Sequence, residues 1–208
     1  MTELASVIWA VQMSTVEFHP WNSRRADTER PDEWRIDLTR CRTASSPRCA
    51  GSPTSRTRSS ANSALTGWPK TSGGNGLHIY VRIEPRWGFA DVRRAALAFA
   101  REVERRAPDD VTTTWWRKDR DPTMLFVDYN QNARDHTIAS AYSVRGVPEA
   151  TVSTPSPGTR STTSTRASSP SPPCPPASPS SATCTRASTT RAYSLDTLLE
   201  WAERDGLD

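Results

Sequence analysis

With 208 residues, the chain has the length of one domain or slightly more, and its formal net charge of +4 suggests an anionic partner such as nucleic acid. We see no signal peptide and no apolar run long enough to span a membrane, so we expect a cytoplasmic protein without a membrane partner. The four cysteines have neither C-x-x-C pairing nor zinc-ligand spacing, which argues against a structural zinc site.

The N-terminal part of the chain predicts a helix and two strands. Apolar residues recur at helical spacing over residues 4–13, and a short strand is expected over residues 15–18. A second strand is expected over residues 34–38, where apolar residues alternate with Arg35 and Asp37. Asp37 therefore lies on a largely apolar strand, where a carboxylate is costly unless it is paired, hydrogen-bonded or metal-bound.

A glycine-rich stretch, K-T-S-G-G-N-G-L-H-I-Y, runs from Lys70 to Tyr80. Its three glycines permit backbone angles that other residues resist, and they let a ligand approach the main chain. Lys70 and Ser72 add a cation and a hydroxyl, and the alternating residues that follow predict a strand with His78 on its polar face. The stretch suits phosphate or nucleotide binding, although it lacks the residue order of a P-loop and a plain hairpin turn is the alternative.

The second half of the chain predicts two helices and three short strands. The helices are expected at residues 89–106 and 194–206, and the strands at 112–116, 124–129 and 138–144. Asp128 is a second acid at the end of a largely apolar strand. The apolar face of the C-terminal helix needs a core partner, which the segment before it does not supply.

Residues 39–66 and 156–192 differ in composition from the rest of the chain. They contain nine arginines, no acid and all four cysteines, so the remainder is acidic overall. The second segment has no large apolar residue at all. Such a composition buries too little apolar area to offset chain entropy, so we expect two disordered insertions.

A shift of the reading frame offers an explanation for both segments. Restoring one base turns possible codons for Thr39-Arg40-Cys41-Arg42 into Asp-Pro-Met-Pro. In that frame every serine encoded by TCN becomes Phe, Leu, Ile or Val. The apolar positions so recovered have helical spacing, at 45, 46, 49, 52, 55, 59, 60 and 63. We therefore interpret both segments as frameshifted, with disordered linkers as the alternative.

Four motifs occur in order: F-H-P-W, R-I-D-L, the glycine-rich stretch and L-F-V-D-Y-N-Q-N. They resemble the polymerase domain of bacterial ligase D, a member of the archaeo-eukaryotic primase superfamily. The resemblance implies an α+β fold, a primase-type palm whose antiparallel-rich sheet is flanked by helices. On this interpretation residues 1–154 form a partial palm that lacks its N-terminal region, residues 155–192 are low-complexity, and residues 193–208 add the C-terminal helix of the same domain.

The resemblance also implies a site in which three aspartates hold two divalent ions, Mn or Mg. Asp37 and Asp128 fit the first and third and are the expected catalytic metal ligands. The second falls at Thr39, which the restored base would return to Asp. Nucleotide binding is implied for six further residues: Ser72, His78 and His19 most strongly, Lys70 and Gln131 more weakly, and Arg120 as the arginine nearest to the position of a family arginine.

The function implied is template-directed addition of nucleotides at DNA ends during bacterial non-homologous end joining, by a nucleoid-associated enzyme. Its partners would be nucleoside triphosphates, DNA ends, a Ku homodimer and an ATP-dependent DNA ligase module. Because Thr39 falls where the resemblance implies an aspartate, we expect activity to be impaired. Two alternatives remain: a catalytically dead remnant that only binds nucleotide or nucleic acid, and an RNA-binding adaptor whose binding through the Arg/Ser segments falls steeply with salt.

The frameshift is testable at the DNA level. Sequencing the locus across codons 36–70 and across the second segment should reveal one missing or added base near each junction. An independently confirmed, intact open frame at both junctions would refute the interpretation.

Overall fold

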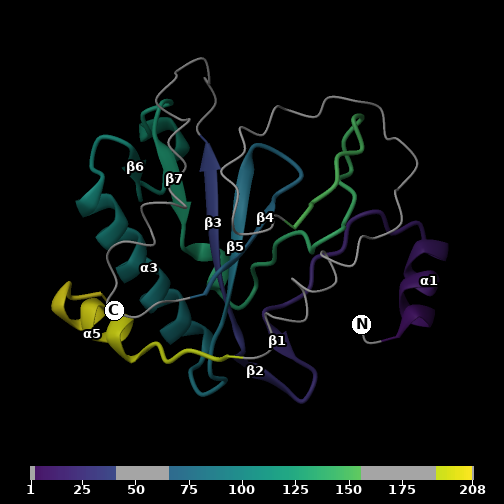
Figure 1. Ribbon diagram of the computed structural model, residues 1–208, viewed down its shortest axis with the longest axis horizontal. Coiled ribbons are helices and arrows are strands. Elements are labelled where there is room, and N and C mark those ends of the chain that lie inside the picture. The colour runs from purple at the N-terminus through teal and green to yellow at the C-terminus, as the bar shows by residue number, and fades with distance from the viewer. Residues whose placement is uncertain (1–2, 41–65, 156–190, 208) are drawn as a thin grey trace.

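The computed structural model describes residues 3–40, 66–155 and 191–207. Its centre is a five-stranded sheet on which helices pack (Figure 1). In spatial order the strands are β4 (Trp68–Thr71), β5 (Gly76–Arg82), β3 (Glu33–Arg40), β7 (Leu125–Asp128) and β6 (Val111–Thr112). Every pairing is antiparallel except that of β6 with β7. This antiparallel-rich sheet with flanking helices confirms the expected fold class.

The central strand β3 separates an apolar face from a polar one. Trp34 is 1% exposed and packs edge-on against Phe99, with ring centroids 4.9 Å apart. Ile36 and Leu38 follow at every second position and are buried in the same core. Arg35 and Asp37 alternate with them, so both charged side chains lie on the opposite face of the sheet. The alternation in the sequence therefore predicts the core face of β3 correctly.

Two helices cover the apolar face of the sheet. Helix α3 (Phe89–Arg106) buries the stripe predicted for it, including Val92 and Ala95, against β3 and β5. Helix α5 (Asp196–Arg204) packs on α3, and its Ala202 meets Ala98 in a small cluster. The core partner that the C-terminal helix needs is therefore α3, which has a second apolar side formed by small residues.

The N-terminal helix α1 (Leu4–Gln12) forms as predicted but does not bury its apolar face. Leu4, Ile8 and Trp9 are all more than half exposed, and Ala10 is the buried residue of the helix. In Figure 1 α1 lies at the right-hand edge of the view, apart from the sheet. A two-stranded hairpin follows it, made of β1 (Ser23–Arg24) and β2 (Asp27–Pro31). No helix in the described ranges is both long and apolar enough to cross a bilayer.

Three strands expected from the sequence are absent or shorter. Residues 15–18 and 138–144 are irregular, and the strand expected at 112–116 is confined to Val111–Thr112. The first two segments contact each other through isolated bonds: Ser140 donates its backbone N–H to Phe18 O at 2.8 Å. Neither segment has a strand neighbour, so β-propensity alone does not produce a ladder.

The first segment of unusual composition was expected to be disordered from residue 39, but its first two residues belong to a strand. Thr39 and Arg40 are part of β3, where Thr39 pairs with Gly76 and Phe126 and Arg40 pairs with Leu125. The expectation of disorder from residue 39 onward is therefore wrong at these two positions. The same expectation for 41–65 and 156–190 lies outside the described residues.

Asn132 attaches the turn after β7 to the central strand. It lies in the 3-10 helix η4 (Asn130–Asn132), and its side chain is fully buried. Its Oδ1 accepts the backbone N–H of Arg35 at 2.9 Å, and its Nδ2 donates to Arg35 O at 2.8 Å. One side chain therefore satisfies both main-chain groups of a residue in the middle of the sheet.

We predict that Asn132→Ala lowers the free energy of unfolding by about 2–4 kcal/mol, because it leaves two buried backbone groups without partners. Denaturant unfolding followed by circular dichroism measures this. Gln12→Ala, at an exposed position of α1, is the control and should change stability by less than about 0.5 kcal/mol. Equal unfolding midpoints for the two variants would contradict the role assigned to Asn132.

Candidate active site

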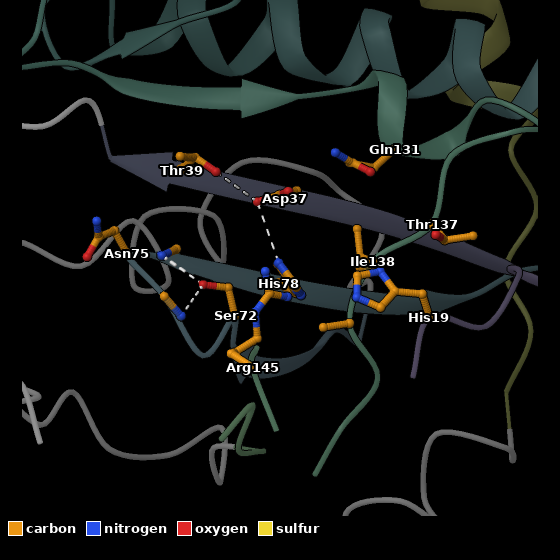
Figure 2. Close-up of a pocket in the computed structure, with 13 residues that line it drawn as sticks. His19, Asp37, Thr39, Ser72, Asn75, His78, Gln131, Thr137, Ile138 and Arg145 are labelled. Carbon is orange, nitrogen blue, oxygen red and sulfur yellow. Dashed lines mark hydrogen bonds and ion pairs between the residues drawn. The ribbon is translucent and has the colours of Figure 1, made fainter. Parts of the chain in front are cut away.

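A pocket opens on the polar face of the sheet, beside the glycine-rich turn (Figure 2). Strand β3, strand β5, the turn between β4 and β5, and residues 137–145 all contribute to it. Its lining comprises His19, Asp37, Thr39, Ser72, Gly74, Asn75, Gly76, His78, Gln131, Thr137, Ile138, Ala139 and Arg145. Five of the residues singled out from the sequence are therefore brought together: His19, Asp37, Ser72, His78 and Gln131.

Four charged or ionisable residues form a row across four neighbouring strands. Lys70 of β4 is the register partner of His78 of β5, His78 is the partner of Asp37 of β3, and Asp37 is the partner of Asp128 of β7. The two acids that the resemblance assigns to one site are therefore register partners. Register partners on one face have neighbouring side chains, so the sheet itself sets the spacing along this row.

The two carboxylates have different surroundings. Asp128 accepts the backbone N–H of Asn130 at 2.9 Å and the side-chain amide of Gln131 at 3.0 Å. Asp37 is more deeply buried; it accepts the Thr39 hydroxyl at 3.1 Å and lies 3.8 Å from His78 Nε2. Figure 2 shows both of these Asp37 contacts as dashed lines. Burial and the charge of Asp128 raise the pKa of Asp37 to about 6, against a weaker opposing effect of the Thr39 hydroxyl.

Burial is the main cause of the raised pKa of Asp37, and repulsion from the Asp128 carboxylate adds to it. A divalent cation between them would relieve this repulsion, and carboxylate oxygens are the ligands that Mg²⁺ and Mn²⁺ prefer. The acids thus fit a metal ion in their chemistry. The described ranges contain no cluster of three or more His, Cys, Asp or Glu suited to a metal, so a third carboxylate is missing there. Thr39 occupies that position with a neutral hydroxyl.

The glycine-rich turn is built around the Ser72 hydroxyl. Ser72 Oγ accepts the backbone N–H groups of Gly74 and Gly76, at 3.1 and 3.0 Å. Gly73 adopts φ +74°, and a Cβ on Gly76 would lie 2.8 Å from Leu38 O, so both positions favour glycine. Because both lone pairs of Ser72 Oγ are engaged, its O–H remains available to donate to a ligand in the pocket.

Lys70 lies behind the pocket, and its side chain is not solvated. It is 2% exposed, and its Nζ contacts His78 Nδ1 at 2.8 Å and Ser153 Oγ at 2.5 Å. Burial, and then the nearby charge of Arg35, lowers the pKa of Lys70 to about 8. Burial and the Lys70 charge lower the pKa of His78 to about 3, so His78 is neutral at physiological pH.

His19 and Arg145 both line the pocket and both contact the Glu17 carboxylate. The Glu17 carboxylate lies 2.8 Å from His19 Nε2 and 3.5 Å from Arg145 Nε, and it accepts the backbone N–H of Gly146 at 2.5 Å. Sequence analysis did not single out Arg145. No local pattern indicates its place, because that place depends on Glu17, far along the chain.

The structure does not bring Arg120 to the pocket. Its guanidinium donates to the carbonyls of Thr114 and Trp115, at 2.6 and 2.5 Å, and lies over the ring of Phe126. These contacts hold the turn around η3 (Arg117–Asp119) against β7. Gln131 lines the pocket, where its amide donates to Asp128.

We predict an unusual pH dependence from Asp37. Its folded-state pKa of about 6 exceeds the ordinary value of 3.8, so Asp37 binds a proton more tightly in the folded state than in the unfolded state. This contribution to stability is present at low pH and is lost as pH rises from 3.8 to about 6. In EDTA, the free energy of unfolding of Asp37→Asn, taken relative to that of the wild type, should therefore rise by up to about 3 kcal/mol between pH 4 and pH 7. Denaturant unfolding at several pH values measures this difference.

Asp121→Asn is the matched control, because Asp121 is exposed on a turn and Thr123 lowers its pKa. It should show no such gain. A constant difference between Asp37→Asn and the wild type over this pH range would contradict the raised pKa.

Comparison with known proteins agrees with this geometry. Residues 1–159 match the family described as LigD, primase-polymerase domain. The chain is 33% identical over 150 residues to the multifunctional non-homologous end joining protein LigD of Pseudomonas aeruginosa, covering 72% of this chain and 18% of that protein. It is 26% identical over 155 residues to the bifunctional non-homologous end joining protein LigD of Bacillus subtilis, covering 74% and 25% respectively.

A solved structure has the same fold. The polymerase domain from Mycobacterium tuberculosis Ligase D, in complex with DNA, matches with a TM-score of 0.62 and 21% identity, over 99% of this chain and 66% of that one. The chain spans only 18% and 25% of the length of the two curated relatives above. Together with the match over residues 1–159, these similarities show that the chain belongs to the LigD primase-polymerase domain family.

Proposed function

We propose that this domain binds a nucleoside triphosphate and divalent metal at the pocket, for template-directed nucleotidyl transfer at DNA ends in non-homologous end joining. The observation that carries the proposal is the register pairing of Asp37 with Asp128 beside a pocket lined by hydrogen-bond donors. Membership of a metal-dependent polymerase family supports it, as does the DNA bound to the M. tuberculosis domain. DNA ends, a Ku homodimer and an ATP-dependent ligase module are the partners proposed.

The donors in the pocket suit the phosphates of a nucleotide. The Ser72 hydroxyl, His78 Nε2 and the Arg145 guanidinium all belong to residues that line it. A phosphate chain offers only acceptors at neutral pH, so several converging donors favour it over a neutral ligand. His19, paired with Glu17, lies at another part of the lining and is proposed to contact the triphosphate and sugar.

The two acids are proposed to hold Mn²⁺ or Mg²⁺ at the edge of this donor set. When bound, such an ion supplies charge neutralisation and activates the attacking hydroxyl in phosphoryl transfer. The residues of this chain have the complementary task of orienting the phosphates. Ser72 is fixed by two backbone N–H groups, and His78 is held by neighbours on both sides, so neither needs to reorganise around a ligand.

We propose that catalysis is impaired because of Thr39. The second candidate function is a catalytically dead domain that still binds nucleotide. The Thr39 hydroxyl donates to Asp37 Oδ1 at 3.1 Å, from the position that the family pattern gives to an acid. A hydroxyl cannot supply the missing negative charge. Losing such a ligand is expected to lower the rate by orders of magnitude, because charge neutralisation and positioning supply most of this catalysis.

We predict no measurable primer extension by the 208-residue chain with manganese and all four ribonucleotides, while GTP binding in the presence of manganese persists. Thr39→Asp should tighten manganese binding by about tenfold or more, since it adds a carboxylate to the site. It should not restore extension by itself, because the other residues of 39–66 and 156–192 remain as they are. Calorimetry with manganese and with GTP, and a gel-based extension assay, measure these quantities.

Asp128→Ala and Asp121→Asn are the paired controls, one at the site and one on an exposed turn. Asp128→Ala should abolish manganese binding, and Asp121→Asn should leave it unchanged. Robust extension by the wild type would show that Thr39 is tolerated, and Asp128→Ala should then remove that activity. Absence of any nucleotide binding by the folded wild type would contradict the proposed function.

A further inference from the structure

We propose that Lys70 is a positioning residue that fixes the tautomer of His78, so that His78 presents an Nε2–H donor to the pocket. The inference rests on the proposed function for its consequence, since the donor is useful to an anionic ligand. It assigns Lys70 a role behind the pocket, in place of the direct nucleotide contact implied by resemblance.

Lys70 has three acceptors around its ammonium group. Its Nζ lies 2.8 Å from His78 Nδ1, 2.5 Å from Ser153 Oγ and 3.3 Å from Thr71 O. The Ser153 hydroxyl donates to Thr71 O at 2.7 Å, so its oxygen faces Lys70 as an acceptor. Ser153 is fully buried and Lys70 nearly so. An ammonium has three donors and no lone pair, and each donor has one acceptor here.

This arrangement determines which nitrogen of His78 carries the proton. Nδ1 must accept from Lys70, so in the neutral ring the proton resides on Nε2. That nitrogen points the other way along the row, to a position 3.8 Å from Asp37 Oδ1 (Figure 2). His78 is thereby a donor toward the pocket, whereas the opposite tautomer would present a lone pair to an anionic ligand and repel it.

The neighbourhood of Lys70 supports the ammonium form. Its Nζ lies 5.5 Å from the centroid of the Tyr80 ring, which favours a cation. An imidazolium would direct an N–H of Nδ1 at the ammonium, so the 2.8 Å contact between Lys70 Nζ and His78 Nδ1 requires a neutral ring. The pair therefore consists of a charged donor and a neutral acceptor, and both are held by the strand pairing of β4 with β5.

Nitrogen NMR on the ¹⁵N-labelled full chain tests the inference without any ligand. The chain has three histidines, so long-range ¹H–¹⁵N correlations assigned with His78→Gln identify the His78 ring. We expect the wild type to show only the Nε2–H tautomer, together with a slowly exchanging ammonium signal from Lys70. The chain has one other lysine, the exposed Lys118, whose signal should exchange rapidly. A wild-type ring protonated at Nδ1 overturns the proposal by itself.

Variants then test whether Lys70, and not another neighbour, sets the tautomer of His78. Lys70→Met should give a mixture of tautomers and weaken GTP binding roughly tenfold or more, because a hydrogen bond to a charged phosphate is lost in part of the population. Lys70→Arg, which still has only donors, should retain the Nε2–H tautomer. Lys118→Met is the matched control and should change neither quantity. An unchanged Nε2–H tautomer in folded Lys70→Met would overturn the proposal; if that variant does not fold, the wild-type spectrum decides.

The two proposals fail in different ways. A wild type with the Nε2–H tautomer that binds no GTP would contradict the proposed function and leave the role of Lys70 intact. A wild type that binds GTP with His78 protonated at Nδ1 would contradict the role of Lys70 and leave the proposed function intact.

Discussion

The candidate site depends on one buried guanidinium, that of Arg35. Arg35 is 2% exposed, and its guanidinium donates to the carbonyls of Pro20 and Trp21, at 2.8 and 3.0 Å, which fixes the segment that carries His19. The backbone N–H and C=O of the same residue are both bonded to the Asn132 side chain. Arg35 therefore connects the central strand to both the His19 segment and the turn after Asp128. A charge in this position is tolerated because its donors reach carbonyls and the Glu33 carboxylate, 2.8 Å away.

On the polar face of the sheet, strand pairing sets the positions of the other charged and ionisable side chains. The row of Lys70, His78, Asp37 and Asp128 needs no loop to assemble it, because each member is the register partner of the next. The loop-borne groups, Ser72 and Arg145, are then added at its border and are held by local bonds: Ser72 by two backbone N–H groups and Arg145 through Glu17. The site thus combines a rigid row with a bordering set of donors, which is the arrangement that preorganised binding requires.

Sequence reasoning found the elements with strong periodicity. Alternation predicted β3 and β5 with their buried faces, and helical spacing predicted α3, because burial on one face imposes those periods directly. It failed where structure depends on distant neighbours: residues 138–144 were expected to form a strand, yet their pairing is limited to an isolated bridge between Val144 and Val152. The burial of Lys70 behind the pocket could not be predicted, because nothing local indicates that Ser153, far along the chain, supplies an acceptor for it. Arg145 was missed for the same reason, since its place depends on Glu17.

The pairing of Asp37 with Asp128 has a consequence for folding. On β7, Val127 faces the core and Asp128 shares the polar face of the sheet with Asp37, so slipping this strand by one residue would turn the carboxylate into the apolar layer with Trp34 and Val92. An unpaired carboxylate is strongly disfavoured there. β7 is only four residues long and offers few other constraints on its alignment. The acids proposed to serve catalysis thereby also destabilise sheets in which β7 pairs in a shifted register. Replacing Asp128 with an apolar residue would remove this destabilisation of the wrong register.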